Sequence, residues 1–327
     1  MTRTLDTLAR RAAALTVLTL ALLAGPAAGA SSQPQPQGQL LRLPNPQTIT
    51  AGAGSIWVTT SHEIVRIDPR TDTMIARIPL PGATRPVFPG GMAVDGHLLW
   101  VTVTPISTSP TSSLPSALWS IDTRTNQVVG APIPLQLAGG SGIASAAGSL
   151  WITNNNHGQF GRLYQVSVST RKLVRALRIP NAPASLVASA GKLWVGESDN
   201  GTIVRVNPIT GTIAGNPIKT GGALLTLAAD RSRLWVADSY KGRLLAINTA
   251  TGKQTSEHPL AGIWNVIAAG GSVWAVLGRT GELIKIDPAT NAPSGVRRPI
   301  LGGAEGGLTS GGYLWLLNPH GVARVNP

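Results

Sequence analysis

Carboxylates and histidines are the side chains in this sequence that could do acid–base or metal chemistry. The chain of 327 residues has 14 Asp and Glu and five His. The segment Glu197-Ser-Asp-Asn-Gly201 has the composition of the first half of a calcium-binding loop, but the twelfth position, where an EF-hand needs Glu, is Pro208. An EF-hand is therefore excluded. No cofactor is predicted, and a looser site for a divalent cation, Ca²⁺ or Mg²⁺, is the alternative.

Other common catalytic arrangements are missing from the sequence. It contains no cysteine, which excludes a thiolate nucleophile, a disulfide and a cysteine-ligated metal. The histidines show no His-x-x-x-His spacing, and no Gly-x-Ser-x-Gly motif occurs. We therefore assign no catalytic residue from the sequence.

A tryptophan repeat indicates which elements position these side chains. Seven segments of the type Gly-x-Leu-Trp-Val follow one another roughly every 42 residues, the period of a propeller blade. Their tryptophans are Trp57, Trp100, Trp151, Trp194, Trp235, Trp274 and Trp315. We interpret them as packing residues between blades.

A turn motif follows most of these tryptophans. Val65-Arg-Ile-Asp-Pro-Arg-Thr-Asp72 is typical: Asp bonds its own backbone, Pro presets φ, and Asp, Asn or Gly closes the turn. In blade three the motif is replaced by Val166-Ser-Val-Ser-Thr-Arg-Lys172, which predicts a weaker turn.

The repeat and the turn together predict an all-β fold, a seven-bladed β-propeller with four-stranded blades. In the fourth blade we expect strands at residues 186–189, 193–196, 202–206 and 212–217. The last unit stops after its third strand, so we expect the strand that begins at Gln39 to complete it and close the ring.

The residues nine positions before each tryptophan should begin the inner strands and line the central channel. They are Thr48, Gly91, Gly142, Ser185, Thr226, Asn265 and Gly306. One position earlier, Trp264 and Glu305 depart from the pattern of the other blades. Trp264 with Asn265 and Glu305 is a candidate ligand site, because a flat apolar face beside polar groups suits an amphipathic ligand. The alternative is a tryptophan that plugs the channel mouth.

One face of the propeller should carry the remaining candidates, because the loops after the Trp strands and the connections between blades share it. The further candidate ligand-binding residues on this face are Arg85, His157, Glu197, Asp238 and Tyr240. A Ser/Thr/Pro-rich insert, Pro105–Pro115, belongs to the same face, either as a flap that contacts a partner or as a tolerated insertion.

The N-terminus reads as a secretion signal. A basic stretch with Arg10-Arg11 precedes an apolar run, Ala12–Ala24, which is too short for a membrane span, and an Ala-x-Ala cleavage site ends at Ala30. We expect a signal peptide at residues 1–30, a flexible leader at 31–38 and the propeller at 39–327. Ordinary secretion is favoured over the twin-arginine route, and the mature protein should be extracellular or associated with the cell envelope.

The Gly-x-Leu-Trp-Val and Arg-Ile-Asp-Pro-x-Thr segments resemble the extracellular YVTN-type propeller repeats. Trp194-Val-Gly-Glu197 and Trp235-Val-Ala-Asp238 also resemble the repeat of streptogramin lyases, which is similar to NHL repeats. The resemblance implies a funnel-shaped propeller with a central channel. The lyases use His, Glu and a divalent metal on one face, and here Glu197 and Asp238 are the positions that carry over.

Charge and motif content together favour a binding role. The chain carries a net charge of +13, and loss of residues 1–30 removes three Arg and one Asp, which leaves +11. Such a surplus favours anionic polymers, although it also occurs as a plain solubility feature. We expect a secreted, monomeric binding scaffold that recognises a partner protein, peptide or anionic cell-envelope polymer. The alternative is a metal-assisted lyase or lactonase. Nucleic acid is not an expected partner, because the basic residues are dispersed and not interleaved with aromatics.

Overall fold

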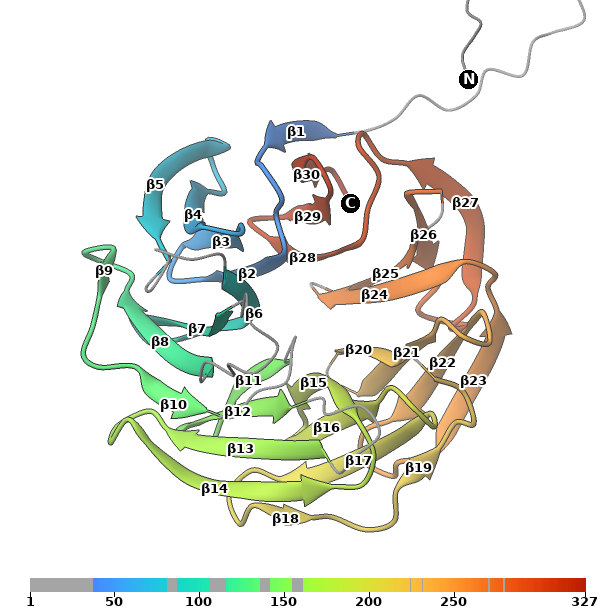
Figure 1. Ribbon diagram of the computed structural model, residues 1–327. Helices are drawn as coiled ribbons and strands as arrows, with labels where there is room; N and C mark the ends of the chain where they lie inside the picture. The colour runs from blue at the N-terminus through green and yellow to red at the C-terminus, as the bar shows by residue number, and fades with distance from the viewer. Residues whose placement is uncertain are drawn as a thin grey trace, which may run out of the picture. The chain divides into compact units, whose positions relative to one another are not determined.

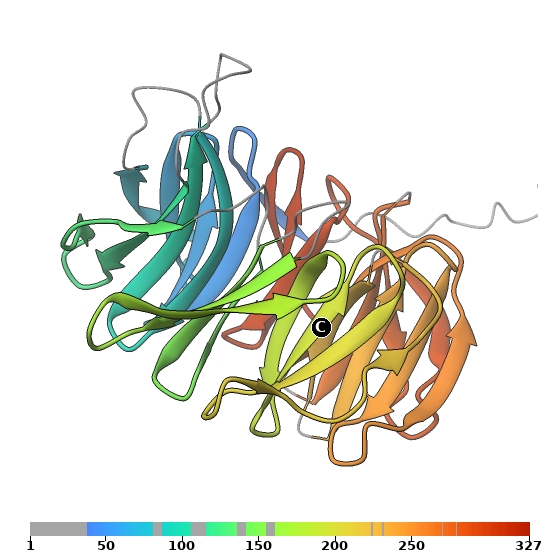
Figure 2. The ribbon, with the colours of Figure 1, turned by 60° about the horizontal axis from the view of Figure 1, so that its bottom comes forward.

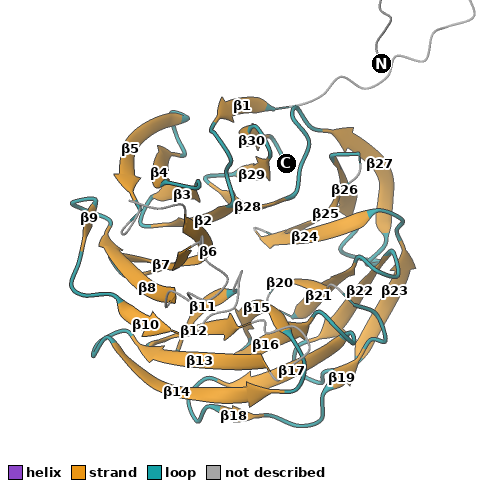
Figure 3. Ribbon diagram, in the orientation of Figure 1, coloured by secondary structure: helices purple, strands orange, loops and turns teal. Residues whose placement is uncertain are grey.

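Seven antiparallel sheets are arranged around a central axis as the blades of a propeller (Figure 1). The computed structural model describes residues 38–80, 87–105, 116–135, 142–154, 161–223, 225–230, 232–269, 271–278 and 280–327. Within these ranges all regular elements are strands, coloured orange in Figure 3, and no helix capable of crossing a membrane occurs. The predicted all-β, seven-bladed propeller is confirmed.

Blades one to four follow in chain order, each built from its inner strand outward. Their strands are, in blade one, β2 (Thr48–Gly52), β3 (Ser55–Thr59), β4 (Glu63–Asp68) and β5 (Thr73–Pro79); in blade two, β6 (Val87–Asp95), β7 (Leu98–Pro105), β8 (Ser116–Asp122), β9 (Gln127–Val128) and β10 (Ile133–Leu135); in blade three, β11 (Ile143–Ala146), β12 (Ser149–Asn154), β13 (Gly161–Ser167) and β14 (Lys172–Ile179); and in blade four, β15 (Pro183–Ser189), β16 (Lys192–Glu197), β17 (Thr202–Asn207), β18 (Thr212–Ile213) and β19 (Ile218–Lys219).

The remaining three blades complete the ring. Their strands are, in blade five, β20 (Leu225–Ala229), β21 (Arg233–Asp238), β22 (Arg243–Asn248) and β23 (Gln254–Pro259); in blade six, β24 (Ile263–Ala269), β25 (Ser272–Leu277), β26 (Glu282–Ile286) and β27 (Pro293–Pro299); and in blade seven, β28 (Gly306–Ser310), β29 (Tyr313–Asn318), β30 (Gly321–Val325) and β1 (Gln39–Arg42).

The N-terminal strand closes the ring, as predicted. Strand β1 pairs antiparallel with β30, with Gln39 opposite Arg324 and Arg42 opposite Gly321. Leu43, which follows the strand, is only 3% exposed and packs with residues of blades one and seven. The two ends of the propeller therefore hold each other in one sheet.

The blade tryptophans form the core between neighbouring blades. All seven are at most 1% exposed. Trp57 packs with Leu99 of blade two, and Trp235 packs with Val273 and Ala275 of blade six. Both faces of each middle strand are covered by a neighbouring blade, which is why these strands read Leu-Trp-Val instead of alternating with polar residues. The packing role predicted for these tryptophans is confirmed.

Basic side chains cover several of these rings. The Arg66 guanidinium lies 4.9 Å from the centre of the Trp57 ring, and that of Arg171 lies 5.1 Å from Trp100. Lys285 and Arg298 lie 5.2 and 4.9 Å from Trp274. Part of the basic surplus therefore acts inside the fold, as cations over aromatic rings.

The turns after the third strands form as the motif predicts. The Asp68 carboxylate accepts a hydrogen bond from the Arg70 backbone N–H at 2.9 Å, and Asp72 closes the turn with a φ of 58°. In blade three, Ser167 accepts from the Thr170 N–H at 3.2 Å and Arg171 takes the left-handed position. Arg171 also donates to the Ser120 hydroxyl of blade two, which helps hold this weaker turn.

The outer strands of blades two and four differ from the expectation. The predicted continuous strand 212–217 is wrong: β18 and β19 are separate short strands that both pair with β17. A Gly-x-Pro sequence interrupts both outer strands, with left-handed Gly130 and Gly215 at φ of 65° and 68°. The left-handed glycine bends the chain and proline lacks the N–H that pairing needs.

Candidate functional site

The strands of the blades run between two faces of the ring (Figure 2). One face carries the loops that join second to third strands and the connections that lead into each inner strand. We call it the loop face. The other carries the hairpins after the inner strands and the turns after the third strands. Of the candidate residues, Trp264, Asn265, Glu305, Glu197, Asp238 and Tyr240 lie on or beneath the loop face. Arg85, His157 and the insert at 106–115 lie outside the described residues.

A cavity of about 570 Å³ opens where the inner strands begin, at the mouth of the central channel. Thr48, Ser185, Thr226 and Asn265 contribute to its wall, as do Gly91 and Gly142. Six of the seven positions predicted to line the channel are thus confirmed. Gly306, the seventh, lies against Asn265: a Cβ there would come within 2.8 Å of the Asn265 amide nitrogen.

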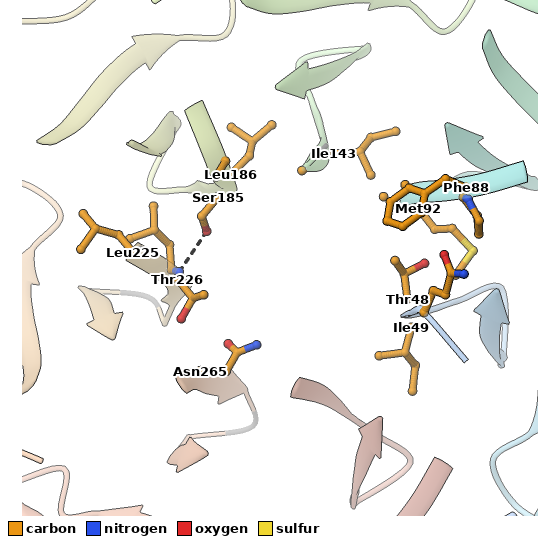
Figure 4. Close-up of a pocket in the computed structure, with 17 residues that line it drawn as sticks. Thr48, Ile49, Phe88, Met92, Ile143, Ser185, Leu186, Leu225, Thr226 and Asn265 are labelled. Carbon is orange, nitrogen blue, oxygen red and sulfur yellow. Dashed lines mark hydrogen bonds between the residues drawn. The ribbon is translucent and has the colours of Figure 1, made fainter. Parts of the chain in front are cut away.

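Hydrogen bonds join neighbouring blades around this mouth. The Ser185 hydroxyl accepts a hydrogen bond from the Leu227 N–H at 3.0 Å (Figure 4). The Thr226 hydroxyl donates to the carbonyl of Trp264 at 3.3 Å, and the Asn265 side-chain amide donates to the carbonyl of Glu305 at 3.4 Å. These bonds fix the polar groups in place from blade to blade.

Trp264 is an exposed but positioned aromatic side chain at the rim. It is 51% exposed, and its carbonyl also accepts from the Ser239 hydroxyl at 3.3 Å. Gly278 lies directly beneath it, since a Cβ at that position would approach Trp264 Cβ to 2.9 Å. The side chain thus rests against the loop after β25 of its own blade, and it is not among the residues that line the channel-mouth cavity. Glu305, on the neighbouring connection, is exposed.

Two more aromatic side chains are exposed on the loop face. Tyr240, predicted as a candidate, is 75% exposed. Phe88, which was not predicted, is 44% exposed and lines the channel-mouth cavity. It was missed because the inner strand of blade two is bulged between Pro89 and Met92, which adds residues ahead of the repeat position. The signal that could have indicated it is its rarity, since the chain contains two phenylalanines.

Glu197 is enclosed below the loop face. It is 0% exposed, Oε2 accepts a hydrogen bond from the Asn181 side-chain amide at 2.8 Å, and Oε1 has no hydrogen-bond partner. Burial raises the pKa of the Glu197 carboxyl above its usual value, and interactions with the side chains of Asn181, Asn200 and Thr202 offset only part of that rise. The side chain is not among those that line the channel mouth.

Asp238 is also 0% exposed, but both of its carboxylate oxygens accept hydrogen bonds. Oδ2 accepts from Arg243 Nε at 2.9 Å, and Oδ1 accepts from the N–H groups of Lys241 at 3.1 Å and Ala223 at 3.4 Å. Arg243 also pairs with Glu257 at 2.6 Å. This network ties the loop after β21 to the connection that precedes β20. Within the described residues, no group of three or more His, Asp and Glu side chains is placed to hold a metal ion.

Comparisons with known proteins agree on the fold. No family model and no curated protein sequence matches this chain. Among solved structures, the chain is similar to virginiamycin B lyase from Staphylococcus aureus, with a TM-score of 0.69 and 20% identity over 89% of this chain and 99% of that one. A chain of the mitotic checkpoint complex matches with a TM-score of 0.66 and 11% identity, over 95% and 100% of the two chains.

An extracellular domain is also among the similar structures. It belongs to a one-component system of B. thetaiotaomicron and matches with a TM-score of 0.64 and 16% identity, over 90% of this chain and 42% of that one. At these identities the likeness shows the propeller fold alone. Membership of the YVTN or NHL repeat families remains a prediction from the sequence motifs.

Proposed function

We propose that this protein is a secreted binding scaffold that recognises a partner protein, a peptide or a cell-envelope polymer through its loop face. The observation that carries the proposal is the exposure of three aromatic side chains on that face: Phe88, Tyr240 and Trp264, at 44, 75 and 51%. Exposed aromatic residues supply most of the binding energy at many interfaces. The partner that fits them is one with apolar groups to bury.

The comparisons are compatible with this role. The similar structures include one of a protein assembly and one extracellular domain. Their range of roles supports a scaffold whose loops, and not its blades, decide what is bound.

Salt dependence separates two modes of binding. Exposed basic residues lie on both faces: Lys172 and Lys253 lie at the outer strands near the opposite face, and Lys241 lies beside Tyr240 on the loop face. The exposed aromatic side chains lie on the loop face. Adhesion to an anionic polymer through the outer strands should weaken steeply with salt, because screening acts on exposed charges. Recognition through aromatic contacts should not.

Retention on an isolated cell-envelope fraction, at low and at physiological salt, tests the proposal. The variant Phe88→Ala/Tyr240→Ala/Trp264→Ala should lose retention at both salt concentrations. The control variant Lys172→Ser/Lys253→Ser should lose only the salt-sensitive part. Unchanged retention of the aromatic variant would exclude the loop face as the binding surface.

The alternative, a metal-assisted lyase or lactonase, depends on Glu197, whose pKa is raised and whose Oε1 is unpartnered. A bound Ca²⁺ or Mg²⁺ would stabilise the fold by mass action. A fall in melting temperature on addition of chelator, reversed by Ca²⁺ or Mg²⁺ and absent in Glu197→Gln, would favour this alternative over the scaffold.

A further inference from the structure

Among the described residues, no charged side chain lines the channel-mouth cavity. Seventeen of them, at or next to the inner strands of blades one to six, form its wall, and none is Asp, Glu, Lys, Arg or His. A charged ligand would lose its hydration there without gaining a counter-charge, which is costly. The cavity therefore favours an uncharged occupant. Its volume of about 570 Å³ is in the range of small-molecule sites.

Both sides of this cavity combine apolar and polar side chains. Phe88 and Met92 lie on one side together with Thr48, and Ser185 and Thr226 lie on the opposite side together with Leu186 and Leu225 (Figure 4). A ligand that fits therefore offers both apolar groups and hydrogen-bonding groups. A pyranose ring has both: its C–H groups form a flat apolar face, and its hydroxyl groups point outward.

Several polar groups of the wall retain hydrogen-bonding capacity. Gln47 Oε1 is buried without a partner, although Nε2 of the same side chain donates to the Ser61 hydroxyl. The Ser185 hydroxyl accepts from Leu227, and its own O–H is left to donate. Asn265 uses one of its two amide hydrogens on the Glu305 carbonyl. The Ser185 O–H and the second amide hydrogen of Asn265 are therefore the groups that a ligand oxygen could accept from.

Trp264 lies beside the cavity and is not one of the residues that line it. It is 51% exposed, its carbonyl is held by two hydroxyl groups, and its side chain lies against Gly278. An exposed aromatic ring is a surface on which the C–H face of a sugar can stack.

We propose that the channel mouth binds the end of a neutral glycan, with one sugar residue inside the cavity and the next stacked on Trp264. This inference rests on the proposed function, because it names the ligand class of the same loop face. It adds that the ligand is uncharged.

Titration calorimetry of the purified protein with maltotriose, cellotriose and tri-N-acetylchitotriose tests it, with trigalacturonic acid as the charged comparator. At least one neutral trisaccharide should bind, and Trp264→Ala should weaken that binding about tenfold. Thr226→Val, which removes one hydroxyl and preserves shape, should weaken it several-fold. Ile209→Ala, at a residue 79% exposed on the opposite face, is the matched control and should leave it unchanged.

Three results would overturn the inference: no neutral trisaccharide binds at ~10 mM, a concentration that reveals even millimolar affinity; Trp264→Ala binds as tightly as the unaltered protein; or trigalacturonic acid binds as tightly as the neutral sugars. If the sugars fail while retention on the cell-envelope fraction still depends on the loop-face aromatics, this inference falls and the proposed function stands. If both fail, both fall.

Discussion

The residue three positions after each blade tryptophan is buried in all seven blades. It is polar in five of them: Thr60, Asn154, Glu197, Asp238 and Asn318. Thr60 accepts from the Glu63 N–H, Asp238 from the Lys241 N–H and Asn318 from the His320 N–H. These side chains hold the loop that follows the Trp strand. A polar residue at this position therefore serves the fold whether or not it also serves a ligand.

Glu197 is the member of this set whose charge should be unfavourable. Because its pKa is raised in the folded state, protonation of Glu197 favours folding, and the protein loses stability as pH rises from the ordinary carboxyl pKa through that raised pKa. Glu197→Gln keeps the shape and the acceptor for Asn181 but removes the charge. It should therefore raise the free energy of unfolding at pH 8, with little difference from the unaltered protein below pH ~4.

Urea denaturation at pH 4 and pH 8 measures this difference. Glu305→Gln, at an exposed carboxylate of the same face, is the control and should change stability little. A Glu197→Gln variant that is less stable at pH 8 would show that the fold, or an ion bound to it, requires the carboxylate charge.

Asp230 has the opposite behaviour. Burial alone would raise its pKa, but hydrogen bonds from the N–H groups of Ser232 and Arg233 and from the Trp235 indole outweigh burial and lower it. Its stabilising effect is present above the ordinary carboxyl pKa and is lost as pH falls through the lowered value. Asp230→Ala should lower the free energy of unfolding by ~2 kcal/mol at pH 7, because it leaves the Trp235 indole unpaired. The loss should be smaller towards pH 3, where the carboxylate of the unaltered protein becomes protonated. Thermal melts across this pH range measure it, and a pH-independent loss would contradict the role of the charge.

At the scale of the element, strand β1 connects the two ends of the chain. Removing it uncovers the edge of β30 and takes away Leu43, whose burial alone is worth ~2 kcal/mol. A protein that starts at Asn45 should therefore melt at least ~5 °C below one that starts at Ser31. A protein that starts at Gly38 keeps β1 and should have the same melting temperature as the protein that starts at Ser31. Equal melting of all three would show that the ring does not depend on this strand.

The blades were predictable because their signals recur, and the site was less predictable because its residues do not. Each Trp strand and each turn repeats the same physical requirement, so errors in one blade are corrected by the others. The Gly-x-Pro breaks at Gly130 and Gly215 occur in two blades and were overlooked. Trp264 and Asn265 were found as exceptions to the repeat, whereas Phe88 precedes a bulge that no count from Trp100 reveals.

At the scale of the whole molecule, part of the positive charge supports the core and part is exposed on both faces, as at Lys241 beside Tyr240 on the loop face. Arg66, Arg171, Lys285 and Arg298 lie over blade tryptophans and support the core. The exposed aromatic side chains of the described residues, Phe88, Tyr240 and Trp264, lie on the loop face in blades two, five and six. The net charge is therefore a poor guide to what the loop face binds, and the cavity at the channel mouth, whose described lining residues are all uncharged, is the better one.

A photo-crosslinking side chain tests most directly whether the loop face is the binding surface. p-Benzoylphenylalanine would replace Tyr240 on the loop face and, separately, Ile209 on the opposite face, and each protein would be irradiated with the cell-envelope fraction. We expect covalent adducts from position 240 and none from position 209. Adducts from position 209 alone, or from both positions equally, would contradict it.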